Sequence, residues 1–278
     1  MAKGIGLIGN FRGKVGNMVG YNLKDSNNKQ TQGVRVYQPV VKNPKTYAQA
    51  EQRAKLSPIN ATYRALKPII DRGQESKAYG NKSRLAWLKN AIKNYNGMWY
   101  GKGAVVEHVV LVELTHGTLA PVLNFTTGTG TVALSVSNFT PGATPTIGDV
   151  STAILAAYPA LKNGDQITFV ACGPVQGLAS AEFDSIVLDT ESTVALGGHF
   201  SASTNRVEFS PTQVDCAAIA VMYSRQGANG EHLRSSVTLK AKSDYPSDDD
   251  WDAAKESAIK SYMAGGNTSD WPEEQIQG

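Results

Sequence analysis

The sequence predicts an α+β protein whose helices and strands occupy different parts of the chain. Glycine is abundant and apolar residues recur in short runs, which is typical of strands and turns rather than of a helical bundle. Two segments between residues 43 and 95, in contrast, carry apolar residues at the three- and four-residue steps of a helix. With 278 residues, the chain is long enough for one large domain or two of ordinary size.

The N-terminal residues predict a β-hairpin. Glycine alternates with apolar and basic residues over residues 4–37, which indicates extended backbone with tight turns. A turn cluster of Asp, Ser and Asn at 25–28 separates two β-type runs at 19–23 and 33–37. We therefore expect these runs to pair as neighbouring antiparallel strands.

Two helices are expected after the hairpin. Asn43 and Pro44 are a typical helix start, because Asn caps the first turn and Pro fits the first helical position. Pro58 removes a backbone hydrogen bond, so it is expected to kink or divide the first helix. The first apolar stripe consists of Leu56, Ile59, Tyr63, Leu66 and Ile70. The second consists of Leu85, Leu88, Ile92 and Tyr95. The two stripes are expected to pack on each other or on the hairpin.

From residue 105 the chain changes to short β-type runs separated by Gly, Pro, Asn and Thr clusters. Seven such runs occur, at 105–114, 131–136, 166–170, 185–188, 206–209, 217–223 and 235–239. Seven short strands with turn signals between them predict an antiparallel β-sandwich of immunoglobulin-like or fibronectin-like architecture. A short inserted helix is expected at 149–161. A last amphipathic helix is expected at 251–262, because the acids just before it complement its dipole.

Charge divides the chain into a basic N-terminal part and an acidic remainder. Residues 1–105 carry 19 Lys and Arg against four acids, and the remaining residues carry eight against 20. A split of this size indicates contact with nucleic acid or another anionic surface. The alternative is that the two parts neutralise each other within the chain or between subunits. The expected units are a basic hairpin-plus-helices domain at 1–104, a β-sandwich domain at 105–243 and an acidic helix and tail at 244–278.

The motifs that would indicate catalysis fail on their spacing. The glycines of residues 4–9 match a dinucleotide-binding motif, but no strand precedes them. Residues 80–83 lack the Gly-Lys pair of a phosphate-binding loop, and residues 248–259 lack the glycine and the bidentate acid of a calcium loop. The four histidines match no metal or nucleophile spacing. We therefore expect a protein that is not an enzyme and needs no cofactor or metal.

Cysteine content and hydropathy limit the chain further. Cys172 and Cys216 are too few for a disulfide framework or a Cys-built zinc site, and we expect two buried thiols, with a single inter-strand bridge as the alternative. Glycines interrupt the apolar residues of the N-terminus, and no run of about 18 apolar residues occurs. Neither a standard signal peptide nor a membrane span is expected.

The basic hairpin is the expected nucleic-acid contact, because cations neutralise phosphates, aromatic rings stack on bases and glycines allow close approach. These features suit binding that tolerates many sequences. The hairpin residues are Arg12, Lys14, Tyr21, Lys24, Lys29, Arg35 and Tyr37. Three further cations share one face of the second expected helix: Lys82, Lys89 and Lys93. Alternatively, the hairpin edge adds strands from a neighbouring subunit.

Three segments carry a resemblance to a known family. Residues 6–21 (GLIGNFRGKVGNMVGY), 34–36 (VRV) and 43–53 (NPKTYAQAEQR) resemble an uncharacterised domain-of-unknown-function family of bacterial and phage genomes. That family has a Gly-x-Phe-x-Gly-Lys-Val-Gly start, an Asn-Pro-x-Thr-x-Ala-Gln helix start and a C-terminal β-sandwich. The match is specific up to about residue 70 and looser beyond, and the acidic tail after Asp244 departs from it. The resemblance implies a fold and no established activity, and its phage association implies a structural role.

The sequence therefore predicts a non-enzymatic structural or packaging protein associated with a phage or mobile element. Its basic half would contact nucleic acid or an anionic partner, and its β-sandwich would mediate assembly into an oligomer with other virion or assembly proteins. The alternative is a surface or adhesion module whose β-sandwich binds a protein or glycan. The expected location is the virion or the cytoplasm of the producing cell.

Overall fold

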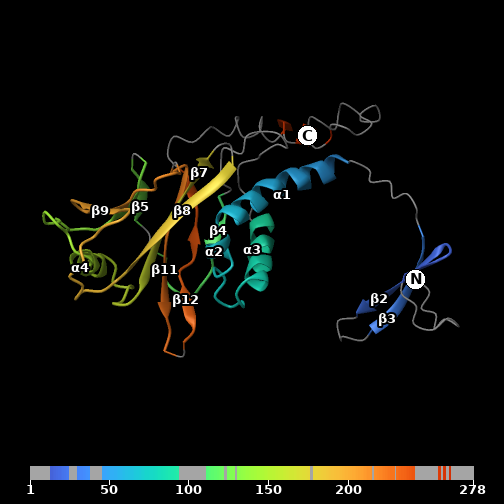
Figure 1. Cartoon of the computed structure of the whole chain (residues 1–278), viewed down its shortest axis with the longest axis horizontal. Coiled ribbons are helices and arrows are strands. Elements are labelled where there is room, and N and C mark those ends of the chain that lie inside the picture. Colours follow the sequence, from blue (N-terminus) through green and yellow to red (C-terminus); the bar gives the residue numbers. More distant parts are fainter. Residues whose placement is uncertain are drawn as a thin grey trace. The chain divides into compact units, whose positions relative to one another are not determined.

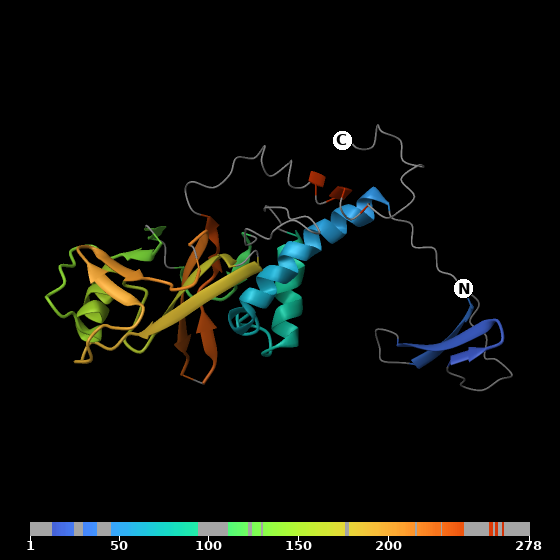
Figure 2. The same cartoon turned by 45° about the horizontal axis from the view of Figure 1, so that its top comes forward.

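The computed structural model describes most of the 278-residue chain, which divides into two compact units, residues 1–45 and 46–278 (Figures 1 and 2). The described residues are 13–24, 30–37, 46–93, 111–121, 124–128, 130–175, 178–214, 216–228, 230–241, 256–257, 259–260 and 263. Their strands pair antiparallel within every sheet, and helices accompany the sheets, so the fold is α+β as expected.

The first unit contains a three-stranded antiparallel sheet in the order β1 (Gly13–Val15), β2 (Met18–Lys24) and β3 (Gln30–Val36). The expected hairpin is confirmed, because β2 and β3 pair from Met18 opposite Val36 to Lys24 opposite Gln30. Strand β1 was not expected from the sequence. It pairs with β2 and brings a third row of side chains to the sheet.

The second unit begins with three helices, α1 (Tyr47–Ala65), α2 (Lys67–Ile70) and α3 (Asn81–Lys93). The expected division of the first helix at Pro58 is wrong. Helix α1 continues through Pro58, whose carbonyl oxygen accepts a hydrogen bond from Thr62 Oγ1 at 3.0 Å. The break falls at Leu66 instead, and Pro68 lies in the first turn of α2, where a missing N–H costs no helical hydrogen bond.

The apolar stripe expected on the second helix is confirmed in part, because Leu88 and Ile92 are half-buried against the core that this helix shares with α1 and α2. Leu85 is 59% exposed, whereas the buried positions of α3 are Ser83, Trp87 and Ala91. Trp87 is 1% exposed, and its Nε1 donates to the carbonyl oxygen of Glu113 at 2.8 Å. The indole ring thus sets the rotation of the helix, because it buries the largest apolar surface and has a fixed partner. Tyr95 lies outside the described residues.

Two larger sheets and a fourth helix follow. The four-stranded sheet has the order β5 (Phe125–Thr127), β6 (Val132–Ser135), β10 (Arg206–Phe209) and β9 (Phe200–Ser203). The five-stranded sheet contains β12 (His232–Arg234), β11 (Ala218–Gln226), β7 (Gln166–Val175) and β8 (Leu178–Val187) in that order, with β14 (Lys240–Ala241) also paired to β11. A separate pair joins β13 (Val237–Thr238) and β4 (Glu113–Thr115).

Most of the expected β runs and the inserted helix are confirmed. Each of the six runs after residue 130 contains part of a strand. Helix α4 (Ile147–Ala157) occupies the expected insertion, and Thr146 and Asp149 close a reciprocal capping box at its start. Of the run at 105–114, only its last four residues are described, and β4 begins within them.

The five-stranded sheet is the central layer of the second unit, with a hydrophobic core on each face (Figure 1). On one face, Phe169 and Val221 pack with the four-stranded sheet and α4. On the other face, Val170 and Ala220 pack with helices α1 to α3. The double burial explains why β7 and β11 are almost continuously apolar. The helices therefore share a core with the β-strands, and the expected boundary between residues 104 and 105 lies outside the described residues.

The described residues near the C-terminus contribute to a third, small core. Residues 256–257, 259–260 and 263 are helical, within or next to the segment where the last helix is expected. Ile259 and Met263 are buried against Ala50 and Ala54 of α1.

Candidate functional site

The pairing register of the three-stranded sheet sorts its side chains onto two different faces. Directly paired residues in neighbouring strands share a face, and side chains alternate along each strand. Lys14 pairs with Val19, and Val19 pairs with Arg35. Tyr21 lies two residues beyond Val19 in β2, so it belongs to the same face. The ring of Tyr37 also lies here, in contact with Lys14.

Two cation–aromatic contacts organise this face. Lys14 Nζ lies 3.6 Å from the centroid of the Tyr37 ring, and Arg35 Cζ lies 6.0 Å from the centroid of the Tyr21 ring. Tyr21 pairs with Gly33, where an added Cβ would come within 2.7 Å of the ring. Glycine thus allows the ring to lie across the neighbouring strand. Exposed cation–π contacts of this kind are worth about 0.5 to 1 kcal/mol each.

Four of the seven hairpin residues expected from the sequence therefore come together. We call this set, Lys14, Tyr21, Arg35 and Tyr37, the cation–aromatic face. Arg12 and Lys29 lie outside the described residues, and Lys24 ends β2 with its side chain outside the described part.

The opposite face of the same sheet is apolar and exposed. Met18 pairs with Val36, and Val34 follows two residues away along β3. All three side chains are exposed, Val36 to 77%. This face was not predicted from the sequence, because the residues of β2 and β3 that share a face are known only when the register between the two strands is known. Contiguous exposed apolar side chains are typical of surfaces that contact a partner.

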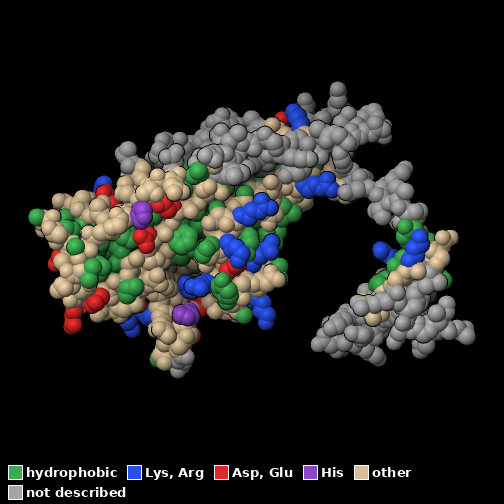
Figure 3. All heavy atoms as spheres, viewed as in Figure 1, with side chains coloured by type: hydrophobic (Ala, Val, Ile, Leu, Met, Phe, Trp, Pro, Cys, Tyr) green, Lys and Arg blue, Asp and Glu red, His purple; other side chains and the backbone are tan. Residues whose placement is uncertain are grey.

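The three expected lysines of α3 lie in the second unit. Lys82, Lys89 and Lys93 are all exposed. They belong to a segment, residues 46–93, that contains ten Lys and Arg against three acids. Figure 3 shows Lys and Arg side chains gathered over the helices of this unit. The helical layer therefore presents a basic surface of its own.

One of the acids in this segment is neutralised within the fold. Asp71 is buried, and its carboxylate accepts from Lys67 Nζ at 2.6 Å and from Tyr63 Oη at 2.9 Å. Burial alone would raise the pKa of Asp71, but the hydrogen bonds from Lys67 and Tyr63 and the charge of Lys67 outweigh it, so the pKa is lowered. The carboxylate therefore acts as a structural anchor between α1 and α2.

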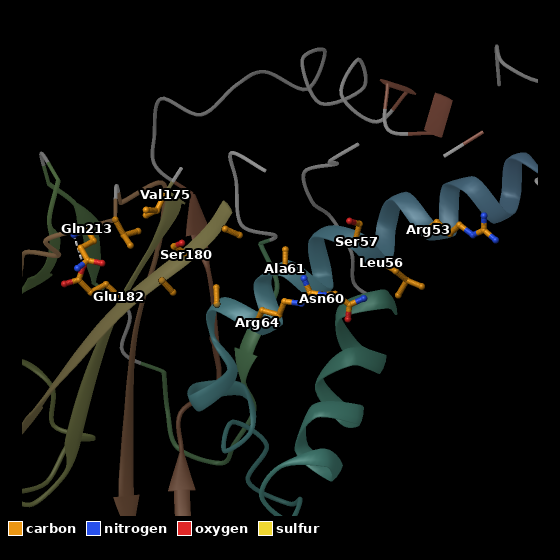
Figure 4. A pocket seen from close by; sticks show the side chains of 14 residues that line it. Arg53, Leu56, Ser57, Asn60, Ala61, Arg64, Val175, Ser180, Glu182 and Gln213 are labelled. Atoms are coloured by element: carbon orange, nitrogen blue, oxygen red, sulfur yellow. Dashed lines mark hydrogen bonds between the residues drawn. The ribbon is translucent and has the colours of Figure 1, made fainter. Parts of the chain in front are cut away.

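A groove of about 840 Å³ lies between α1 and β8 (Figure 4). Arg53 and Arg64 of α1 line it, together with Glu182 of β8. The Glu182 carboxylate accepts from the backbone N–H groups of Thr212 and Gln213 at 2.9 to 3.0 Å. These bonds outweigh the effect of burial and lower the pKa of Glu182. The groove therefore contains an engaged carboxylate at one end and two arginines along α1.

The His, Cys, Asp and Glu residues described in the β region are the candidate ligands for a metal site. Among the residues that the structure describes, no group of three or more His, Cys, Asp or Glu side chains could hold a metal ion. Cys172 and Cys216 are both buried thiols, as expected. Burial, with a smaller effect from Cys216, raises the pKa of Cys172, so this thiol stays protonated and is a poor nucleophile at neutral pH.

Comparison of the chain with protein-family models, with curated proteins and with solved structures gives no match. None of the described helices is long and apolar enough to cross a membrane. The cation–aromatic face is therefore the strongest structural pointer to function in the described residues.

Proposed function

We propose that the chain is a non-enzymatic structural or packaging protein that binds nucleic acid through the cation–aromatic face. The observation that carries the proposal is the strand register that brings Lys14, Tyr21, Arg35 and Tyr37 to one side of the sheet. Cations on such a surface neutralise phosphates, and the aromatic rings offer stacking surfaces to bases. Both contacts tolerate many sequences.

Single-stranded nucleic acid fits this face better than a duplex does. Bases in a duplex are already stacked on each other, whereas those of a single strand are free to stack on Tyr21 and Tyr37. A sheet with aromatic side chains on one face is a surface that single strands bind in several protein folds. We therefore expect the chain to bind single strands more tightly than duplexes of the same length.

We also propose that the larger sheets of the second unit form the expected immunoglobulin-like or fibronectin-like β-sandwich of residues 105–243, which mediates assembly. In support, both of its larger sheets are antiparallel, and they share one hydrophobic core containing Val207 and Phe209 from one sheet and Phe169 and Val221 from the other. The exposed apolar face around Val34 and Val36 supports contact with a further protein. The partners would be other virion or assembly proteins, in the virion or in the cytoplasm of the producing cell.

Fluorescence anisotropy with the full chain tests the nucleic-acid proposal. A labelled single-stranded oligonucleotide is titrated across a salt series with the wild type, with K14A/R35A and with Y21A. We expect K14A/R35A to bind more weakly. The slope of the logarithm of its affinity against the logarithm of salt concentration should become shallower by about 0.7 for each phosphate contact removed. We expect Y21A to bind more weakly with an unchanged slope, because stacking releases no counterions.

The matched control is R206A, which removes an exposed arginine from β10 in the second unit. If the affinity of K14A/R35A equals that of R206A, the sheet face is not the contact and the proposal is wrong.

A further inference from the structure

A second basic hollow lies wholly within the second unit, between the α2–α3 loop and the five-stranded sheet. Its volume is about 760 Å³, within the range of small-ligand sites. Its floor is the helix-facing side of the sheet, beyond the part that the helices cover. Thr168 and Ser185 lie on this floor, with 2.9 Å between their hydroxyl oxygens. This part of the floor therefore carries polar groups, unlike the apolar part of the same face under α1 to α3.

The α2–α3 loop, which forms one wall, is held by hydrogen bonds to the segment around His116. His116 N donates to the carbonyl oxygen of Gly73 at 2.9 Å, and Glu75 N donates to that of His116 at 3.1 Å. An added Cβ at Gly73 would come within 2.7 Å of the Leu114 carbonyl oxygen, so only glycine allows this close approach. These contacts fix the backbone of the loop next to Arg72, and so fix the point from which the Arg72 side chain extends.

Two arginines line this hollow from different elements. Arg72 comes from the α2–α3 loop, and Arg234 comes from β12, where it pairs with Ser224. Burial and the positive charge of Arg72 both lower the pKa of Arg234. The negative charge of Glu75 raises it by less, so the pKa of Arg234 is lowered overall. Both guanidinium groups therefore line one hollow and repel each other, and an anion bound beside them would relieve the repulsion.

Glu75, one of the two described carboxylates that line the hollow, is already engaged with other donors. Glu75 Oε2 accepts from the backbone N–H groups of Thr118 at 3.0 Å and of Arg234 at 2.9 Å, and Oε1 accepts from Thr118 Oγ1 at 2.8 Å. Burial would raise the pKa of Glu75, but these bonds lower it. The other described groups that titrate in this lining are Lys77, Tyr79, Glu231 and His232. Cationic side chains thus outnumber carboxylates in the hollow.

Aromatic side chains line the same hollow. Tyr79 is 66% exposed, and Arg72 Cζ lies 5.2 Å from the centroid of its ring. Phe183 of β8 is also partly exposed and lies on the floor. A ligand that binds here therefore meets two guanidinium groups, aromatic surfaces and hydroxyl groups together.

We propose that this hollow binds a phosphate monoester that carries a planar aromatic ring, the chemistry of a nucleoside monophosphate. Arg72 and Arg234 hold the phosphate, because paired guanidinium groups match its doubly charged oxygens. Tyr79 and Phe183 contact the ring. The site does not depend on the cation–aromatic face, and it concerns a small ligand rather than a strand.

Isothermal titration calorimetry with the full chain tests this site, with AMP, adenosine and inorganic phosphate as separate probes. We expect AMP to bind more tightly than either fragment. R72Q is expected to weaken AMP binding at least tenfold, and Y79A is expected to weaken AMP binding without changing phosphate binding. R206Q, at an exposed position in β10, is the matched control and should bind AMP as the wild type does.

The half-buried Arg234 gives a second variant, R234Q, whose folding is checked by circular dichroism. R72Q keeps the test decisive if R234Q does not fold, because Arg72 is exposed. Absence of AMP binding to the wild type at millimolar concentration, or AMP binding unchanged by R72Q, overturns the proposal. Equal affinities for AMP and inorganic phosphate overturn the assignment of the ring contacts.

Discussion

Two carboxylates of the second unit, Glu182 and Glu75, act as internal hydrogen-bond acceptors beside the hollows described above. Glu182 joins β8 to the Thr212–Gln213 backbone, and Glu75 joins the α2–α3 loop to Thr118 and Arg234. In each case hydrogen bonds to the ionised form outweigh the cost of burial. These residues therefore stabilise the fold in their charged state, and the protein's stability depends on keeping them ionised.

This dependence gives a prediction for pH. The pKa values of Glu75 and Glu182 lie below the ordinary 4.5 in the folded state, so their stabilisation is complete above that pH and is lost as the pH falls through the folded values. We expect the free energy of unfolding to decrease below about pH 4.5. Urea denaturation of the wild type and E182Q from pH 3 to 7 checks this. E182Q should show the weaker pH dependence, and parallel curves would contradict the assignment.

The candidate site could be predicted from the sequence only in part. Cations and aromatic residues interleave between Lys14 and Tyr37, which indicates a binding hairpin, but their common face depends on β1 and on the register of β2. The contact between Glu75 and Arg234 joins residues 159 positions apart, and no local pattern predicts a pair so distant. The second hollow was therefore invisible in the sequence.

The face of helix α3 that is most deeply buried could not be predicted from the spacing of its apolar residues alone. Leu85, Leu88 and Ile92 have helical spacing and predict a buried stripe. Leu88 and Ile92 are half-buried, but Leu85 is exposed, and the fully buried apolar positions are Trp87 and Ala91. Periodicity counts apolar residues equally, whereas packing favours the side chain with the largest buried area and a satisfied polar group. The hairpin, in contrast, was predictable because its turn residues and alternation are local signals.

Paired substitutions on α3 test directly which face is most deeply buried. W87A is expected to lower the free energy of unfolding by about 3 to 5 kcal/mol, because it removes a buried ring and its hydrogen bond to Glu113. L85A is the matched control and should change it by less than about 0.5 kcal/mol, because Leu85 is exposed. Guanidinium denaturation measures both. A larger effect from L85A than from W87A would mean that the helix packs by its leucine stripe.

At the scale of the whole molecule, the central feature is a sheet buried on both faces. Val170 and Ala220 need the helices as cover, just as Phe169 and Val221 need the four-stranded sheet. The helices at 47–93 therefore belong to the β-rich unit, although charge and composition set them apart from it. Amino-acid composition depends on surface residues as much as on core residues. A division of the chain by charge and composition therefore separates the helices from the strands with which they share a core.

Truncated chains test whether the folding unit begins at residue 46, as in the structure, or at residue 105, as the sequence predicts. A fragment of residues 46–278 retains both faces of the central sheet, and we expect a cooperative thermal transition near that of the full chain. A fragment of residues 105–278 loses the helical layer and exposes Val170 and Ala220 to water. We expect it to aggregate or to melt without cooperativity. Equal cooperativity and melting temperature for the two fragments would show that the helices are dispensable.

The most direct measurement of the central claim is photochemical cross-linking of the full chain to a single-stranded oligonucleotide, with the linked residues identified by mass spectrometry. The account predicts cross-links at Tyr21 and Tyr37, whose rings lie beside Arg35 and Lys14 on one face of the sheet. The same cross-links should disappear at high salt, when phosphate contacts weaken. Cross-links confined to the second unit, or none at low salt, would contradict nucleic-acid binding by this sheet.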